Sequence, residues 1–160
     1  MKTLILYYSE SGKSEVVAKT LSSQLFGDLI RIKDLKVRKG FKSKLTSSID
    51  AFRESKTEIS PSKIDLKDYD LIYIGTPVWA SKPTPAIITA IDKFDFRRKE
   101  IILFATMRIS GGEKAIKRME DKLQSRGARV TNSFIIKTQN KNTSNITGDT
   151  LDLIESLNLK

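Results

Sequence analysis

Three serines and a glycine between Ser9 and Ser14 are the residues of this chain best suited to bind an anion. They follow an apolar run at residues 3–8 and precede helical spacing that begins at Ser14. The first N–H groups of a helix have no partner within the helix, and the helix dipole favours a negative charge there. The hydroxyls of Ser9, Ser11 and Ser14 add donors, and Gly12 lets the backbone curve closely around a ligand. The pattern predicts a site for one terminal phosphate; the alternative is that Ser11 or Ser14 only caps the helix.

The letters Gly12-Lys13-Ser14 also end the phosphate-binding loop of nucleoside triphosphatases. The first glycine of that loop would have to stand at Tyr7, which lies inside the apolar run. A tyrosine side chain fills the space that a loop glycine leaves open. The sequence therefore excludes a triphosphatase, and Lys13 adds a positive charge beside a single phosphate.

A second loop, residues 75–83, follows the third apolar run and contains the one tryptophan of the chain. Pro77 stiffens the turn formed by the residues from Thr76 to Ala80. Trp79 offers a broad aromatic surface. The alternative is that Trp79 only anchors the loop in the core.

Residue types that are missing restrict the chemistry further. The 160 residues include no cysteine and no histidine, which excludes a thiolate nucleophile, disulfides, iron–sulfur ligation, an imidazole base and the usual zinc ligand sets. If the protein is catalytic, a bound cofactor carries the reaction.

The formal net charge of +10 favours acidic partners or ligands. Nucleic acid is one such candidate, and a solvated basic face around residues 31–63 is the alternative reading. No apolar run is long enough to cross a membrane, and the chain starts with a strand-like run rather than a signal peptide. We expect no membrane association and a cytoplasmic location.

The strands and helices that must position these loops alternate along the chain. Apolar runs predict strands at residues 3–8, 29–32, 71–74, 101–105 and 130–136, and helical spacing predicts helices at residues 14–26, 40–53, 84–94, 112–126 and 147–157. This alternation predicts a single α/β domain over residues 1–160, with a doubly wound, five-stranded parallel sheet of order 2-1-3-4-5 between two helical layers. In such a sheet the ligand lies beyond the carboxyl ends of the strands, where strands 1 and 3 meet.

At these loops the chain resembles the flavodoxin family. Residues 9–14 match the family's phosphate loop, Ser/Thr-x-Ser/Thr-Gly-x-Ser/Thr, with Lys13 where family members usually have asparagine. Residues 75–83 are similar to the GTPVWAGKP stretch of one branch of the family, and residues 40–53 to its helix before the third strand. Residues 106–112 look like the family's glycine-containing flavin loop, although Met107, Arg108 and Ile109 depart from it. The alternative for Gly111 and Gly112 is a plain helix start.

The resemblance implies a flavodoxin-like fold that binds FMN. The residues it implies for cofactor binding are Ser9, Ser11, Gly12, Lys13, Ser14, Thr76, Pro77, Val78, Trp79, Ala80, Thr106, Met107, Arg108, Gly111 and Gly112. The tyrosine that stacks on the outer flavin face in many flavodoxins has no match, which leaves Met107 or Trp79 for that role. We also expect Arg108 and Lys82 to raise the reduction potential of the flavin by stabilising its reduced anion.

The function implied by the resemblance is an electron carrier between protein partners. The basic chain suggests an acidic redox partner, such as a ferredoxin or a reductase. One alternative is an oxidoreductase that uses NADH or NADPH to reduce a quinone or a similar acceptor. A basic nucleic-acid-binding domain is a third, less favoured reading, because no platform of stacking aromatic residues is evident.

Overall fold

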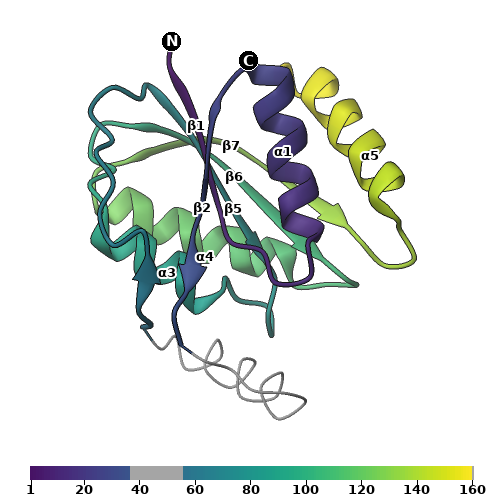
Figure 1. Cartoon of the computed structure of the whole chain (residues 1–160), viewed down its shortest axis with the longest axis horizontal. Coiled ribbons are helices and arrows are strands. Elements are labelled where there is room, and N and C mark those ends of the chain that lie inside the picture. Colours follow the sequence, from purple (N-terminus) through teal and green to yellow (C-terminus); the bar gives the residue numbers. More distant parts are fainter. Residues whose placement is uncertain (37–55, 160) are drawn as a thin grey trace.

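The computed structural model describes residues 1–36 and 56–159. Five strands form one parallel sheet in the order β2-β1-β5-β6-β7 (Figure 1). Their bounds are β1 Thr3–Tyr7, β2 Asp28–Arg31, β5 Leu71–Pro77, β6 Glu100–Met107 and β7 Arg129–Lys137. The sheet confirms the predicted order 2-1-3-4-5, since these are the first to fifth strands of the main sheet along the chain.

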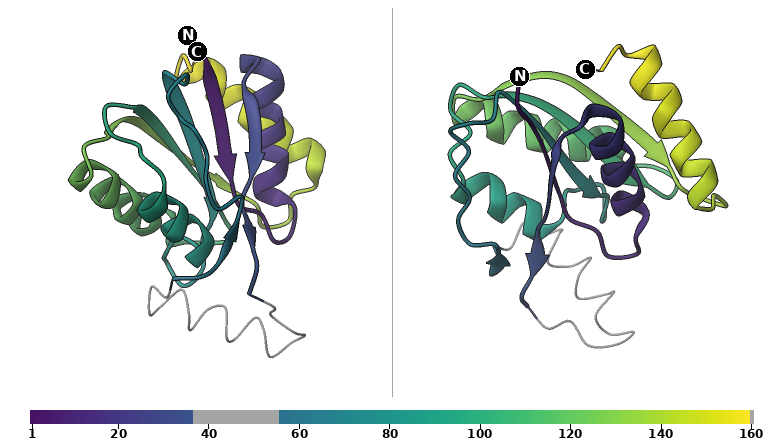
Figure 2. Two further views of the ribbon diagram at one scale, coloured as in Figure 1. Left: turned by 60° about the vertical axis from the view of Figure 1, so that its left-hand side comes forward. Right: turned by 45° about the horizontal axis from the view of Figure 1, so that its top comes forward.

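Helices cover both faces of this sheet. Helices α1 (Lys13–Leu25) and α5 (Thr143–Ser156) lie on one face, and α3 (Pro85–Lys93) and α4 (Gly112–Ser125) lie on the other (Figure 2). The result is the three-layer α/β sandwich expected from the alternation of strands and helices.

The core has two parts, one on each face of the sheet. Under α1 and α5, Leu21 and Ile146 join Tyr73 and Phe104 of the central strands. Under α3 and α4, Ile87 and residues of α4 pack on the opposite side chains of the same strands. Burial on both faces explains why β1 reads as a continuous apolar run.

Strands β5 and β6 extend further than the sequence predicts. The expected strands end at Ile74 and Ala105, whereas pairing continues until Pro77 lies opposite Thr106. The first strand, in contrast, ends at Tyr7 rather than at residue 8. The predicted β5 stops before Gly75 because glycine and proline commonly end strands. Several residues expected in loops therefore stand on rigid strand ends.

Two further differences concern the start of α5 and a second, smaller sheet. Helix α5 begins at Thr143 rather than at residue 147, because Asn142 and Asn145 form a reciprocal capping box. Strands β3 (Lys33–Asp34) and β4 (Ile59–Ser60) form a small antiparallel sheet that the sequence pattern did not indicate. The helix expected at residues 40–53 lies outside the described residues.

Candidate functional site

The carboxyl ends of β1, β5 and β6 lie side by side, because these strands are neighbours in the sheet. The register pairs Tyr7 with Gly75 and Pro77 with Thr106. The Val78 N–H donates to the Thr106 carbonyl at 2.9 Å, which joins the second loop to the third. The three loops expected to form the ligand site therefore meet at one edge of the sheet.

The β1–α1 loop is organised by the Ser9 side chain. Ser9 is buried, and its Oγ accepts hydrogen bonds from the N–H groups of Gly12 and Glu15 at 3.2 and 3.3 Å. These bonds curve the chain over the first turn of α1. Ser11, at the top of the curve, is exposed. Ser9 thus shapes the loop, and Ser11 is accessible to a ligand.

Gly12 provides both the bend and an open space. Its φ of 90° is left-handed, a conformation that side chains disfavour. A Cβ built at Gly12 would meet no atom within 4 Å other than those of Gly12 and its two chain neighbours. Because α1 begins at the next residue, this space lies at a helix N-terminus, where N–H groups attract an anion. The loop therefore has room for a phosphate at the place predicted from the sequence.

Two buried hydroxyl groups connect the first loop to the third. Ser14 Oγ lies 2.6 Å from Thr106 Oγ1, and either can donate. Since each hydroxyl carries one hydrogen and this contact uses one, the pair keeps a hydrogen that can be donated elsewhere. The contact between Ser14 and Thr106 therefore positions α1 against β6. One of the two hydroxyls also keeps a hydrogen that it can donate to a ligand.

Arg31 on β2 holds the outer side of the first loop, a role that the sequence did not predict. Its Nη2 donates to the Ser9 carbonyl at 2.9 Å, and its Nη1 lies 3.4 Å from Glu15 Oε2. Glu15 also pairs with Lys19 at 2.9 Å, and the hydrogen bond from Lys19 lowers the pKa of Glu15. The positive charges of Arg31 and Lys19 thus compensate the negative charge of Glu15, the acidic residue in the first turn of α1. No local motif marks Arg31, because only the pairing of β2 with β1 brings it to the loop.

Lys13 points toward the end of β7. Its Nζ donates to the Lys141 carbonyl at 2.7 Å, and the Lys141 ammonium pairs with Asp149 of α5. A cleft of about 640 Å³ opens at this place. We call it the connector cleft; its lining residues are Ser11, Lys13, Arg108, Thr138, Gln139, Asn140, Lys141 and Asn142. The first three of these are predicted site residues, whereas the β7–α5 connection was not expected at the site.

The β5–α3 loop contains a tight hairpin turn. Trp79 and Lys82 exchange two backbone hydrogen bonds of 2.9 Å, and Ala80 and Ser81 between them have φ values of 49° and 61°. Two central residues with positive φ are typical of a type I′ turn, which usually contains asparagine or glycine. The Thr76 hydroxyl accepts the Thr84 N–H at 3.1 Å and so holds the base of this loop. Ala80 lies exposed at the tip of the turn.

Trp79 lies beside the first loop. Its ring meets the Tyr8 ring edge to face, with centroids 5.8 Å apart and an interplanar angle of 89°. The indole is half-buried, and it packs partly against the core under α3. Trp79 thus combines the two alternatives drawn from the sequence, since it is anchored and still presents aromatic surface at the site.

The β6–α4 loop packs on the turn of the β5–α3 loop. Gly111 has a φ of 92°, and a Cβ there would lie 2.6 Å from Ser81 Oγ, so only glycine permits this approach. Met107 is 5% exposed, with its sulfur beside Gly112. Of the two residues considered for ring stacking, Trp79 therefore offers the surface. Arg108 and Ile109 are exposed at the rim of the loop.

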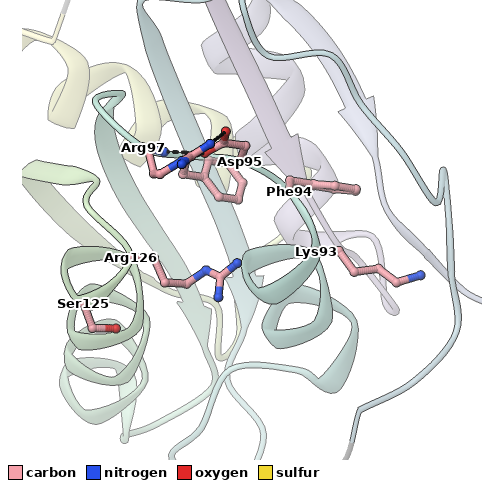
Figure 3. A pocket seen from close by; sticks show the side chains of 7 residues that line it. Lys93, Phe94, Asp95, Arg97, Ser125 and Arg126 are labelled. Carbon is pink, nitrogen blue, oxygen red and sulfur yellow. Dashed lines mark hydrogen bonds and ion pairs between the residues drawn. The ribbon is translucent and has the colours of Figure 1, made fainter.

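A separate pocket of about 500 Å³ lies at the opposite edge of the sheet (Figure 3). It is formed by the end of α3, the α3–β6 connection and the end of α4, and its lining residue Arg97 forms a bidentate pair with Asp95. None of the predicted site residues lines this pocket. We therefore assign the candidate site to the three loops.

Two findings concern metal binding and membrane-spanning helices among the described residues. No cluster of three potential acidic metal ligands occurs within residues 1–36 and 56–159. In the same part of the chain, no helix has both the length and the hydropathy needed to span a bilayer. The cytoplasmic location stays a prediction.

Comparisons with known proteins agree with this geometry. A family model described as Flavodoxin matches residues 2–146. An uncharacterized protein of Methanocaldococcus jannaschii is 27% identical over 139 residues, which cover 86% of this chain and 75% of that relative.

Solved structures are also similar. A flavoprotein of Lactobacillus acidophilus, crystallised in complex with FMN, is 28% identical, with a TM-score of 0.72 over 86% of this chain and 93% of that chain. A protein of Bacteroides uniformis shares the fold, with 24% identity and a TM-score of 0.77 over 92% of this chain and 96% of that chain.

Proposed function

Because the chain belongs to the flavodoxin family, we propose that it is an FMN-binding redox protein that carries electrons between protein partners. FMN, when bound, supplies reversible electron transfer, and the protein supplies its binding, orientation and electrostatic environment. The FMN complex of the Lactobacillus acidophilus relative supports the choice of cofactor.

The observation that carries the proposal is the open space at Gly12. It stands at the N-terminus of α1, and a Cβ there would meet no atom within 4 Å other than those of Gly12 and its two chain neighbours. A phosphate monoester fits such a cradle, because N–H and O–H donors converge on it from one side. Ser9, Ser11, Gly12, Lys13 and Ser14 would hold the phosphate.

The other two loops would hold the flavin ring. Trp79 offers an aromatic face, and Gly111 keeps the two loops in contact. The residues we assign to the ring are Thr76, Pro77, Val78, Trp79 and Ala80 of the β5–α3 loop, and Thr106, Met107, Arg108, Gly111 and Gly112 of the β6–α4 loop. Their part is to position the ring and to exclude water from one of its sides.

The rim of the site suits a protein partner with acidic side chains. Ile109 is 62% exposed and follows the exposed Arg108, and the whole chain carries a net charge of +10. An exposed apolar side chain beside a cation is a common feature of protein-binding surfaces. We expect an acidic redox protein, such as a ferredoxin or a reductase, to dock here.

A second candidate function is an oxidoreductase that takes electrons from NADH or NADPH. The connector cleft favours it, because the cationic side chains of Lys13 and Arg108 line a cavity next to the phosphate loop. The 160 residues contain no second nucleotide-binding sequence motif, which favours the carrier.

The deciding experiment is a flavin titration followed by a reduction assay. We expect the purified protein to bind FMN stoichiometrically and to show a flavin absorption spectrum. Reduction only through an added reductase supports the carrier, whereas rapid bleaching by NADH or NADPH alone supports the oxidoreductase. A protein that remains colourless with excess FMN would contradict both.

A further inference from the structure

We propose that the connector cleft binds the phosphate groups of an adenine nucleotide beside the FMN phosphate. The inference rests on the proposed function, since it takes the first phosphate to occupy the space at Gly12. The volume of the cleft, about 640 Å³, lies within the range of small-molecule sites. Two of its lining residues, Ser11 and Lys13, belong to the phosphate loop itself.

The charge of the lining selects an anion. Lys13, Arg108 and Lys141 line the cleft, and no aspartate or glutamate is among the described residues that do. Lys141 is neutralised by its pair with Asp149. Two other cations line the cleft, Lys13, whose Nζ donates to the Lys141 carbonyl, and the exposed Arg108. Both are also assigned to FMN, so a nucleotide here would share them with the cofactor.

The floor of the cleft is an ordered turn. The Lys141 N–H donates to the Thr138 carbonyl at 3.2 Å, and Asn140 between them has a φ of 58°. Thr138 donates to the Met107 carbonyl from both its N–H and its hydroxyl, at 2.8 and 3.2 Å. This turn is thus hydrogen-bonded to the end of β6, next to Arg108.

The polar side chains of the turn suit a nucleotide. Gln139 and Asn140 are exposed on it, and an amide side chain both donates to and accepts from the edge of a base. The lining thus combines cations, which suit the phosphates of an adenine nucleotide, with amides, which suit its base. Two kinds of ligand contain an adenine nucleotide of this kind. One is FAD bound as the cofactor, through its adenylate half, and the other is free NADH or NADPH.

We would test the cleft by calorimetric titration of ADP into the FMN-loaded protein. The variant Gln139→Glu places a negative charge in the cleft without changing the shape of the side chain. Gln124→Glu makes the same change on α4, where the side chain meets Glu120 far from the cleft. We expect Gln139→Glu to weaken ADP binding about fivefold to tenfold, as an exposed like charge a few ångströms away does. Gln124→Glu should stay within about twofold, because distant charges are screened.

The two sources give different results. If FAD is the source, FAD binds the flavin-free protein more tightly than FMN does, and Gln139→Glu removes the difference. If the source is a free nucleotide, NADH or NADPH competes with ADP on the FMN-loaded protein. The proposal is overturned if ADP does not bind and FAD binds no better than FMN, or if both variants weaken ADP equally. A protein that fails to bind FMN contradicts the proposed function instead, and ADP binding to it can still be measured.

Discussion

Ser14 Oγ and Thr106 Oγ1 lie 2.6 Å apart in the interior, although 92 positions separate the two residues in the chain. The contact fixes the first turn of α1 against the end of β6, and thereby the phosphate loop against the loop expected at the flavin. Each of the two hydroxyls is almost fully buried. The pair is thus one of the contacts that fix these two loops relative to each other.

Replacing Ser14 with alanine should weaken both folding and cofactor binding. The change leaves the buried Thr106 hydroxyl without its partner, which costs about 1–3 kcal/mol in the free energy of unfolding. We expect FMN affinity to fall about tenfold, because one donor is lost and the loop is less well fixed. Urea denaturation of the flavin-free protein and FMN fluorescence quenching measure the two effects. Ser133→Ala, at an exposed position on β7, is the control, and equal FMN affinity in the two variants would disprove the role of Ser14.

The variant Gly12→Ala should distinguish the two roles of Gly12, its left-handed backbone conformation and the open space beside it. The φ of 90° makes alanine strained by roughly 1–2 kcal/mol. Gly127, with a φ of 83° and only ordinary contact distances around a Cβ, gives a matched control at the opposite edge of the sheet. We expect similar losses of stability in Gly12→Ala and Gly127→Ala. Only Gly12→Ala should lose FMN affinity, by a factor of about ten or more, or about 1.4 kcal/mol. An unchanged affinity would mean that the phosphate does not occupy this space.

Arg108→Ala should lower the reduction potential of the bound flavin. An exposed cation several ångströms from the reduced anion stabilises it by about 0.5–1 kcal/mol, or roughly 20–40 mV for one electron. Anaerobic titration against dyes of known potential measures the shift. Lys67→Ala removes a cation near the amino end of β6, where the Lys67 carbonyl accepts from Lys99, and should leave the potential unchanged. A potential that is unchanged or higher in Arg108→Ala would count against the expectation.

Tyr73→Phe should make the protein less sensitive to alkaline pH. Tyr73 is fully buried, and among the described residues its hydroxyl has no hydrogen-bond partner. Burial raises the pKa of Tyr73 from 10.0 to about 12. Above pH 10 the unfolded chain therefore loses a proton that the folded protein keeps, and stability falls as the pH rises toward 12. Phenylalanine removes this contribution, and its effect near pH 7 should be neutral or stabilising by up to about 1 kcal/mol, since an unpaired polar group is removed.

Tyr69→Phe is the comparison for that measurement. The pKa of Tyr69 is also raised to about 12, in this case first by the hydrogen bond that its hydroxyl donates to Asp28 at 2.7 Å. Removing that hydroxyl loses a partnered bond, so Tyr69→Phe should destabilise the protein at pH 7 by about 0.5–1.5 kcal/mol. Urea denaturation at several pH values distinguishes the variants. Equal losses at pH 7 would show that the Tyr73 hydroxyl is satisfied in solution.

Much of the fold could be predicted because its signals are local. The apolar run at residues 3–8 and the helical spacing after Ser14 are each visible within a short window, and their alternation permits few topologies. The same reasoning placed the ends of elements wrongly where strand pairing or helix capping determines them. Pro77 continues β5 because Thr106 lies opposite it, and the start of α5 depends on a capping box rather than on apolar spacing.

The sequence by itself determined the kind of site, since three glycine- or hydroxyl-bearing loops follow strands whose carboxyl ends must share one edge of a parallel sheet. The tertiary structure decided which atoms face one another there. It turned the Ser9 hydroxyl back onto its own loop, brought Arg31 to that loop, and directed Lys13 toward the β7–α5 connection. The physical reason is that the contacts of Arg31 and Lys13 join residues far apart in the chain, so that strand order and helix packing set their geometry. The Ser9 contacts are local, but they depend on the curve of the backbone at Gly12, which the residue types alone do not give.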